Sequence, residues 1–163
     1  MACNGLGVSD IALSNLRFQL PAGWEYYPDP RSPQTAATAP WGGSVINPQK
    51  NCVLHLRVDQ VTPEQGVPDL SRFLANFLTY HLRPIATDEL FHFMLGDLSA
   101  YSWQYHEEFE NGQLNRVKVW VLGNDIGWCF VNFQGPAEAF QGDLETVEDL
   151  LRGLRFQQTA GQS

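Results

Sequence analysis

The sequence predicts an α+β domain, a helix–sheet–helix layered sandwich around a mainly antiparallel sheet. Three observations indicate this class. Residues 90–134 form long strand-like runs joined by short turns, which favours antiparallel pairing. These runs carry large apolar side chains on both faces, and a sheet that is apolar on both faces must be covered on both. Two amphipathic helical patterns, 69–83 and 137–154, can each cover one face.

The first part of the chain predicts three strands and one long loop. Residues 16–20 (LRFQL) alternate apolar and polar side chains, as a half-buried strand does, and lead through a tight turn to Trp24, which we expect to be buried. Residues 44–47 and 52–59 are predicted to be two further strands. Residues 28–43 contain four prolines, which predicts a loop that is too long for an ordinary connection.

Both helical segments place their apolar residues at helical spacing. In the first, Pro68 and Asp69 suit a helix start, and Pro84 ends the pattern. The stripe of the second segment consists of Phe140, Leu144, Val147, Leu151 and Leu154. The acidic residues that lie off this stripe are expected to face water, and they are Asp143, Glu145, Glu148 and Asp149.

The strand-rich centre of the chain predicts a meander. Its expected strands are 90–95, 98–109, 114–122 and 126–134. The pair Asn111-Gly112 predicts a type I′ hairpin turn. Arg155-Phe156 is expected to add a short edge strand after the second helix.

The length of 163 residues fits one domain. We expect that domain at residues 14–157, with the Pro-rich loop at 28–43 inside it. Residues 1–13 are expected to be a flexible N-terminus and residues 158–163 a frayed tail.

The charge balance of the chain limits its partners. It has 10 Lys and Arg against 18 Asp and Glu, a formal net charge of −8, and no basic cluster. Binding to nucleic acid needs a basic surface, so we expect no nucleic-acid partner. No apolar run approaches the roughly 20 residues that span a bilayer, so we expect no membrane insertion. Two interpretations of the negative charge remain: the acidic surface is simply solvated, or it binds a basic protein.

The cysteines and the N-terminal residues indicate a cytoplasmic protein. Cys3, Cys52 and Cys129 are widely spaced, which supports neither a disulfide framework nor a zinc site. The first ten residues lack the basic and apolar regions of a signal peptide.

The sequence holds no recognisable catalytic constellation. The four histidines fall in separate elements, and no nucleotide-binding, hydrolase or metal-ligand motif occurs. Cys129 lies in an apolar strand pattern, where a thiol is a poor nucleophile. We therefore expect no catalytic residues, no metal, no cofactor and no enzymatic activity.

Two segments carry a resemblance to a known group. Phe18–Trp24 (FQLPAGW) is similar to an opening strand followed by the element LP-x-GW, and residues 117–156 resemble a closing hairpin, long helix and terminal short strand. On these segments the chain resembles the Mog1/PsbP-like group, and within it the DUF1795/DcrB-like branch. The resemblance implies a small non-enzymatic binding domain. That branch includes cytosolic chaperones of type VI secretion effectors, which shelter hydrophobic effector helices and are often dimers.

We accordingly expect a protein-binding domain, as a cytosolic chaperone or adaptor for a secreted effector. Its partner would be another protein, such as an amphipathic or hydrophobic effector helix, with a homodimer as a further expectation. The alternatives are an immunity-type or other regulatory binding protein, and a small-ligand binder or enzyme that uses a crevice under loop 28–43. A deep pocket containing His55 or His106 and a carboxylate of perturbed pKa would favour that last alternative.

The partner-binding residues are expected on a partly uncovered sheet face. Two helices can leave part of a doubly apolar sheet open, and exposed apolar patches mark interaction sites. The residues predicted there are Trp41, Tyr101, Trp103, Val119 and Val121. The competing expectation is that loop 28–43 closes the face, with Trp41 as a plug in the core.

Overall fold

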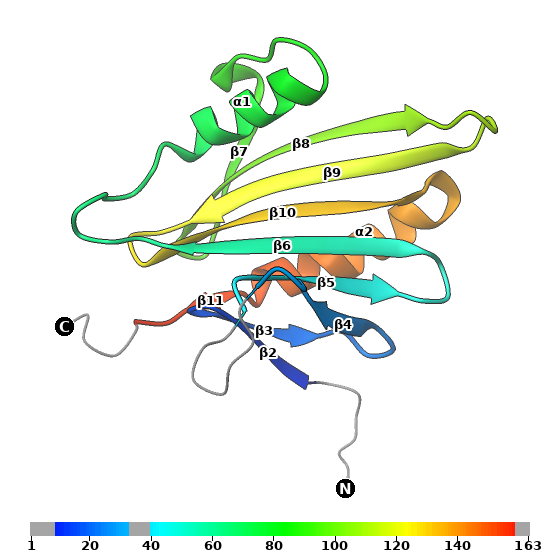
Figure 1. Cartoon of the computed structure of the whole chain (residues 1–163). Coiled ribbons are helices and arrows are strands. Elements are labelled where there is room, and N and C mark those ends of the chain that lie inside the picture. The colour runs from blue at the N-terminus through cyan, green and yellow to red at the C-terminus, as the bar shows by residue number, and fades with distance from the viewer. Residues whose placement is uncertain (1–8, 33–39, 159–163) are drawn as a thin grey trace, which may run out of the picture.

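The large sheet forms the centre of the molecule. In the computed structural model (Figure 1), residues 9–32 and 40–158 are described. Within these ranges seven strands pair in the order β4-β5-β6-β10-β9-β8-β7, and every pairing is antiparallel. The strands are β4 (Glu25–Pro28), β5 (Gly42–Asn47), β6 (Cys52–Gln60), β7 (Phe91–Leu95), β8 (Leu98–Glu108), β9 (Leu114–Gly123) and β10 (Gly127–Pro136).

A second, three-stranded sheet joins the two ends of the domain. It runs β11-β3-β2, with β2 at Ser9–Leu13, β3 at Leu16–Leu20 and β11 at Arg155–Phe156. The strand β2 corrects the expectation of a flexible N-terminus for residues 9–13, because these residues pair with β3 and bury Leu13. Residues 1–8 and 159–163, and residues 33–39 of the Pro-rich loop, lie outside the described residues.

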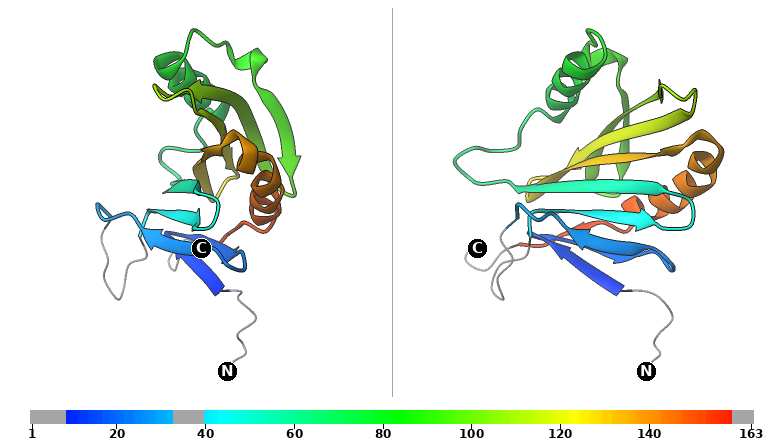
Figure 2. Two further views of the ribbon diagram at one scale, coloured as in Figure 1. Left: turned by 90° about the vertical axis from the view of Figure 1, so that its right-hand side faces the viewer. Right: turned by 45° about the vertical axis from the view of Figure 1, so that its right-hand side comes forward.

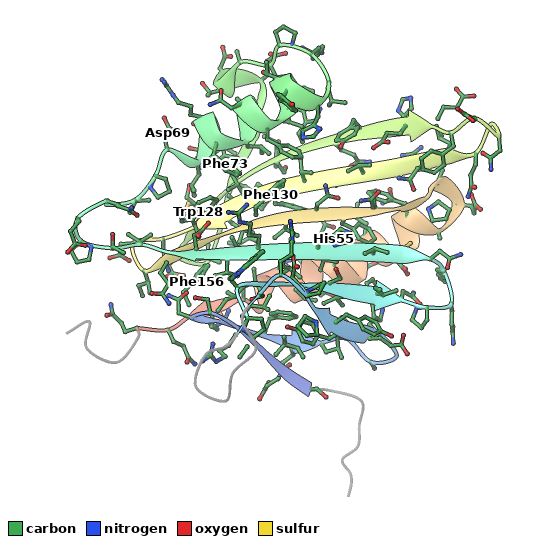
Figure 3. All side chains as sticks on the ribbon, in the orientation of Figure 1. His55, Asp69, Phe73, Trp128, Phe130 and Phe156 are labelled. Atoms are coloured by element: carbon green, nitrogen blue, oxygen red, sulfur yellow. The ribbon has the colours of Figure 1, made fainter. Side chains whose placement is uncertain are left out.

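The helix α1 (Leu70–His81) covers part of one face of the large sheet. Asp69 caps it, since its Oδ1 accepts a hydrogen bond from the backbone N of Arg72 at 3.1 Å. Leu74 and Leu78 pack on valines of β9, and the 3-10 turn η1 (Thr87–Glu89) follows before β7. The rings of Phe73, Trp128 and Phe130 lie between the helix and the sheet (Figure 3).

The helix α2 (Ala137–Arg152) and the small sheet cover the opposite face (Figure 2). All five residues of the predicted stripe are buried, while Glu145 and Asp149 are exposed. The layered α+β sandwich predicted from the sequence is therefore confirmed. Trp24 is also buried, as expected, in the core between the large sheet and the layer of α2 and the small sheet.

Asp143 corrects one expectation about α2. It is only 5% exposed, although its position off the stripe predicted contact with water. Asn47 donates a hydrogen bond from Nδ2 to its Oδ2 at 2.9 Å, and Lys50 Nζ lies 4.0 Å from its Oδ1. The turn between β5 and β6 thus supplies polar partners that make burial of this carboxylate tolerable.

The hairpin between β8 and β9 is longer than predicted. Gly112 has φ of +81°, but Asn111 does not have a positive φ, which a type I′ turn would require. Instead, the backbone N of Gly112 donates to the carbonyl of Phe109, and the N of Phe109 donates to the carbonyl of Gln113. This is the pattern of a three-residue loop with a glycine in the left-handed region.

Replacing Phe140 by alanine should destabilise the domain by about 3–5 kcal/mol, because a large buried aromatic side chain is lost and a cavity is left. Phe140 is fully buried and stacks on Phe133 at a centroid distance of 5.0 Å. Urea denaturation followed by circular dichroism measures the loss. The control is Gln141→Ala, an exposed neighbour whose change should stay within about 0.5 kcal/mol. Equal losses for the two variants would contradict this packing.

Candidate functional site

Four of the five predicted partner-binding residues lie under or beside α1. Val119 and Val121 are fully buried in the core between α1 and the large sheet, which we call the α1 core. In the isolated chain they therefore cannot contact a partner. Tyr101 and Trp103 stand opposite them on β8 and are half-buried. Trp41 lies apart from this group, at the other end of the same sheet face, where it is also half-buried.

A cavity of 540 Å³ opens where α1 stops covering the sheet. It lies over β5, β6 and β10, beneath the described ends of loop 28–43. The residues that matter most for its chemistry are Tyr27, Trp41, His55, Arg57, Phe77 and Phe130. We call it the Trp41 cavity. Figure 3 shows His55 on β6, at a part of the sheet that α1 does not cover.

The register of the sheet brings these side chains to one face. Arg57 pairs with Phe130, and His55 pairs with Asn132 on β10 and with Ser44 on β5. Residues that are directly opposite in an antiparallel pair point to the same side of the sheet. On the other side of β10, Phe130 pairs with Val121 and Asn132 pairs with Val119 on β9. The cavity and the α1 core therefore lie on the same face of the sheet.

Backbone hydrogen bonds hold the rim of the cavity on the Trp41 side. The N of Trp41 donates to Ser32 Oγ at 2.6 Å, and its carbonyl accepts from the N of Val58 at 2.8 Å. The N of Asp29 donates to the carbonyl of Gly42 at 2.9 Å. The backbone of Trp41 is therefore attached to β6, and its side chain is half-buried and belongs to neither buried core cluster.

Two guanidinium groups flank the Trp41 ring. Arg31 and Arg57 lie 5.6 Å and 5.7 Å from its centroid, which is within cation–π range. Arg31 is also held by Asp29, which accepts from its Nε at 3.1 Å and its Nη2 at 2.8 Å. Arg57 makes no ion pair with any carboxylate of the described residues.

Asp29 and His55, two titratable groups of the cavity, have shifted pKa values. Hydrogen bonds from Arg31 lower the pKa of Asp29 to about 2, so this carboxylate stays ionised. Desolvation lowers the pKa of His55, against the opposing charge of Asp29, and its Nδ1 is bonded to Ser44 Oγ at 2.8 Å. A general acid or base works best with a pKa near the working pH, which Asp29 lacks. Asp29 is therefore a poor candidate for proton transfer at neutral pH.

Cys52 and Cys129, the two cysteines among the described residues, do not provide a nucleophile. Burial raises the pKa of Cys52 to about 12 and also raises the pKa of Cys129. Both thiols are buried and unpaired, and they stay protonated at neutral pH. Within residues 9–32 and 40–158, no three His, Cys, Asp or Glu side chains are grouped to hold a metal ion, and no helix has the length and apolar character to cross a membrane.

A second candidate surface is the free edge of the large sheet at β7. Among the described strands it pairs with β8 alone, and its sequence FHFML contains no Lys, Arg, Asp, Glu or Pro. Phe91 is 67% exposed and Met94 is 57% exposed. His92 stacks on Tyr101 at 4.4 Å between centroids, and Trp103 follows Ser102, the β8 partner of Phe91. Two predicted partner residues thus lie next to this edge.

The sequence did not single out Arg57 or the β7 edge as functional. Arg57 occupies an ordinary polar position in an alternating strand, and only the three-dimensional structure shows that it pairs with Phe130 and approaches the Trp41 ring. The β7 run was recognised as a strand, but its position at an edge depends on the strand order. Its lack of charged residues was the one signal available in the sequence.

No protein-family model and no curated protein matches this chain. Solved structures do match. A protein from Bacteroides thetaiotaomicron is 12% identical, with a TM-score of 0.61 over 88% of this chain and 46% of that protein, so the chain spans about half of its length. LpqN from Mycobacterium tuberculosis, which is involved in cell envelope biogenesis, is 11% identical, with a TM-score of 0.56 over 94% of this chain and 87% of LpqN.

The cyanobacterial PsbP (CyanoP) from Synechocystis sp. PCC 6803 is 9% identical, with a TM-score of 0.47 over 96% of this chain and 98% of CyanoP. At these identities the Bacteroides and LpqN matches show the fold alone. Two helices on a mainly antiparallel sheet agree with the layered sandwich predicted from the sequence. Nothing in these likenesses selects the DUF1795/DcrB-like branch.

Replacing Arg31 by glutamine should raise the pKa of Asp29 from about 2 toward its ordinary value, because the hydrogen bonds to the carboxylate are lost. Since the folded-state pKa lies below that of an unfolded chain, the stabilisation from this ion pair is complete above about pH 4. It is lost as the pH falls toward 2. Carboxyl carbon NMR of Asp29 measures the midpoint, and an unchanged midpoint in the variant would contradict this cause.

Proposed function

We propose that this chain is a non-enzymatic protein-binding domain that receives an extended segment of its partner at β7. The observation that carries this proposal is the unprotected β7 edge. An edge strand presents unpaired backbone N–H and C=O groups, and these can hydrogen-bond a strand from another chain. Exposed Phe91 and Met94 add apolar contacts, on opposite faces of the sheet.

Comparison with the other edges in the described part of the chain supports this choice. β4 contains Glu25 and Pro28, β2 contains Asp10, and β11 is only two residues long. Charges, prolines and short length are the usual protections of an edge strand against pairing. β7 has none of the charged or proline protections, so a covering partner is the simplest reason for its sequence.

The proposed partner segment has a definite chemistry. It would be an extended strand with apolar side chains at alternate positions, because β7 offers apolar contacts on both faces. The net charge of −8 favours a segment with basic residues nearby. We favour a strand over an effector helix here, because the open part of the α1 face carries His55 and Arg57 rather than a continuous apolar strip.

The biological setting proposed from the sequence is a cytoplasmic chaperone or adaptor for a secreted effector. The resemblance to the DUF1795/DcrB-like branch supports it, and so do Cys52 and Cys129, whose buried, unpaired thiols fit a reducing compartment. A second copy of the chain, paired through its own β7, is the competing occupant of the same edge.

Affinity capture from the native host tests the proposal with two edge variants, Phe91→Lys and Met94→Lys. Each adds a charge to the edge, and we expect at least a 10-fold loss of the captured partner, or about 1.4 kcal/mol. The matched control is Tyr80→Lys, which replaces an aromatic residue of α1 that is 87% exposed and should leave capture unchanged.

Hydrogen exchange and sedimentation decide which occupant is present. Binding of a partner strand should slow exchange at the β7 backbone amides, and a dimer that both edge variants dissociate would assign the edge to a second copy. Equal capture by the wild type, both edge variants and the control would refute a role for β7.

A further inference from the structure

We propose that the Trp41 cavity binds a small organic carboxylate with a flat, apolar body. The cavity lies on β5, β6 and β10, whereas β7 is at the opposite end of the sheet. This site is therefore separate from the edge proposed to bind protein, and either proposal can fail alone.

The size and walls of the cavity suit a ring system. Its 540 Å³ lies within the range of about 300–1,000 Å³ that is typical of small-ligand pockets. Aromatic groups reach it from three directions: Tyr27 from β4, Phe77 from α1 and Phe130 from β10. Trp41 forms the fourth wall, and its flanking guanidinium groups favour flat partners that stack.

Arg57 supplies the anion-binding group. Asp29 directs both carboxylate oxygens to Arg31, so that pair is already neutralised. Asp59, two residues along β6 from Arg57, forms no ion pair with it and does not line the cavity. Among the described residues, no carboxylate compensates Arg57, and its planar fork matches a carboxylate.

The charge count favours one negative charge on the ligand. His55 has its pKa lowered, so it adds no second full charge at neutral pH, and Arg31 is paired. The chain as a whole carries −8, which opposes a phosphate dianion at a site where, among the described residues, Arg57 is the one Arg or Lys without an ion pair. A carboxylate satisfies Arg57 without leaving excess charge among aromatic walls.

The test uses the isotope-labelled protein, with 1-naphthoate and its neutral analogue 1-naphthamide as probes. We expect 1-naphthoate to shift the NMR signals of the Trp41 indole and of the β5 and β6 amides. It should bind at least about 10-fold more tightly than 1-naphthamide, because only the acid forms a charge-assisted pair with Arg57.

Variants assign the charge to one residue. Arg57→Gln should reduce the affinity for 1-naphthoate to that for 1-naphthamide, and Arg57→Lys should give an intermediate loss. The matched control is Arg152→Gln on α2, across the sheet from the cavity, which should leave the affinity unchanged. Equal affinities of the wild type for the two probes would overturn the proposal. So would 1-naphthoate binding by Arg57→Gln at wild-type strength. Signal shifts confined to a second groove, which Leu20 of β3 and Thr146 and Leu150 of α2 help to line, would also overturn it.

Discussion

The structure depends on a central sheet that is apolar on both faces but is covered unequally. Seven strands at about 4.8 Å spacing span roughly 29 Å, whereas one helix with its side chains is about 10 Å wide. One face is covered by α2 together with the three-stranded sheet, and these bury Trp120, Val131 and Phe133. On the other face α1 is the one described helix that covers the sheet, and it packs on β8, β9 and the aromatic side chains of β10. The Trp41 cavity follows from that shortage of cover.

The side-chain types on the uncovered face reflect the same constraint. Under α1 the cross-strand rows hold Val119 and Val121, and further along the same rows they hold His55 and Arg57. The change from branched apolar to polar side chains occurs where the helix ends its coverage. An open surface with aromatic side chains interleaved with arginine stays hydrated, yet it can still bury a ligand.

Periodicity predicted most elements because each depends on local spacing. The helices at Leu70–His81 and Ala137–Arg152 and the long strands of the meander fall within a few residues of the predicted bounds. β2 was missed because five residues give a weak alternation, and Asp143 was misplaced because its partners, Asn47 and Lys50, are distant in the sequence. The candidate site was harder to predict from the sequence than the helices and strands. Which half of a face α1 covers, and which strand lies at an edge, are settled by strand order and packing, to which a single sequence gives little access.

The pairing of β3 with β11 has a consequence for how the chain acquires its structure. β3 lies near the start of the described chain, and its neighbour Arg155-Phe156 lies near the end, with the whole large sheet between them. The carbonyl of Asn15 accepts a hydrogen bond from the N of Gln157, which fastens the same junction. During synthesis the pairing of β3 with β11 can form only after Arg155-Phe156 has been made, and the sheet face under α2 stays uncovered until α2 has been made. Contacts of such long sequence separation form slowly, which leaves a period in which the nascent chain itself is vulnerable to aggregation.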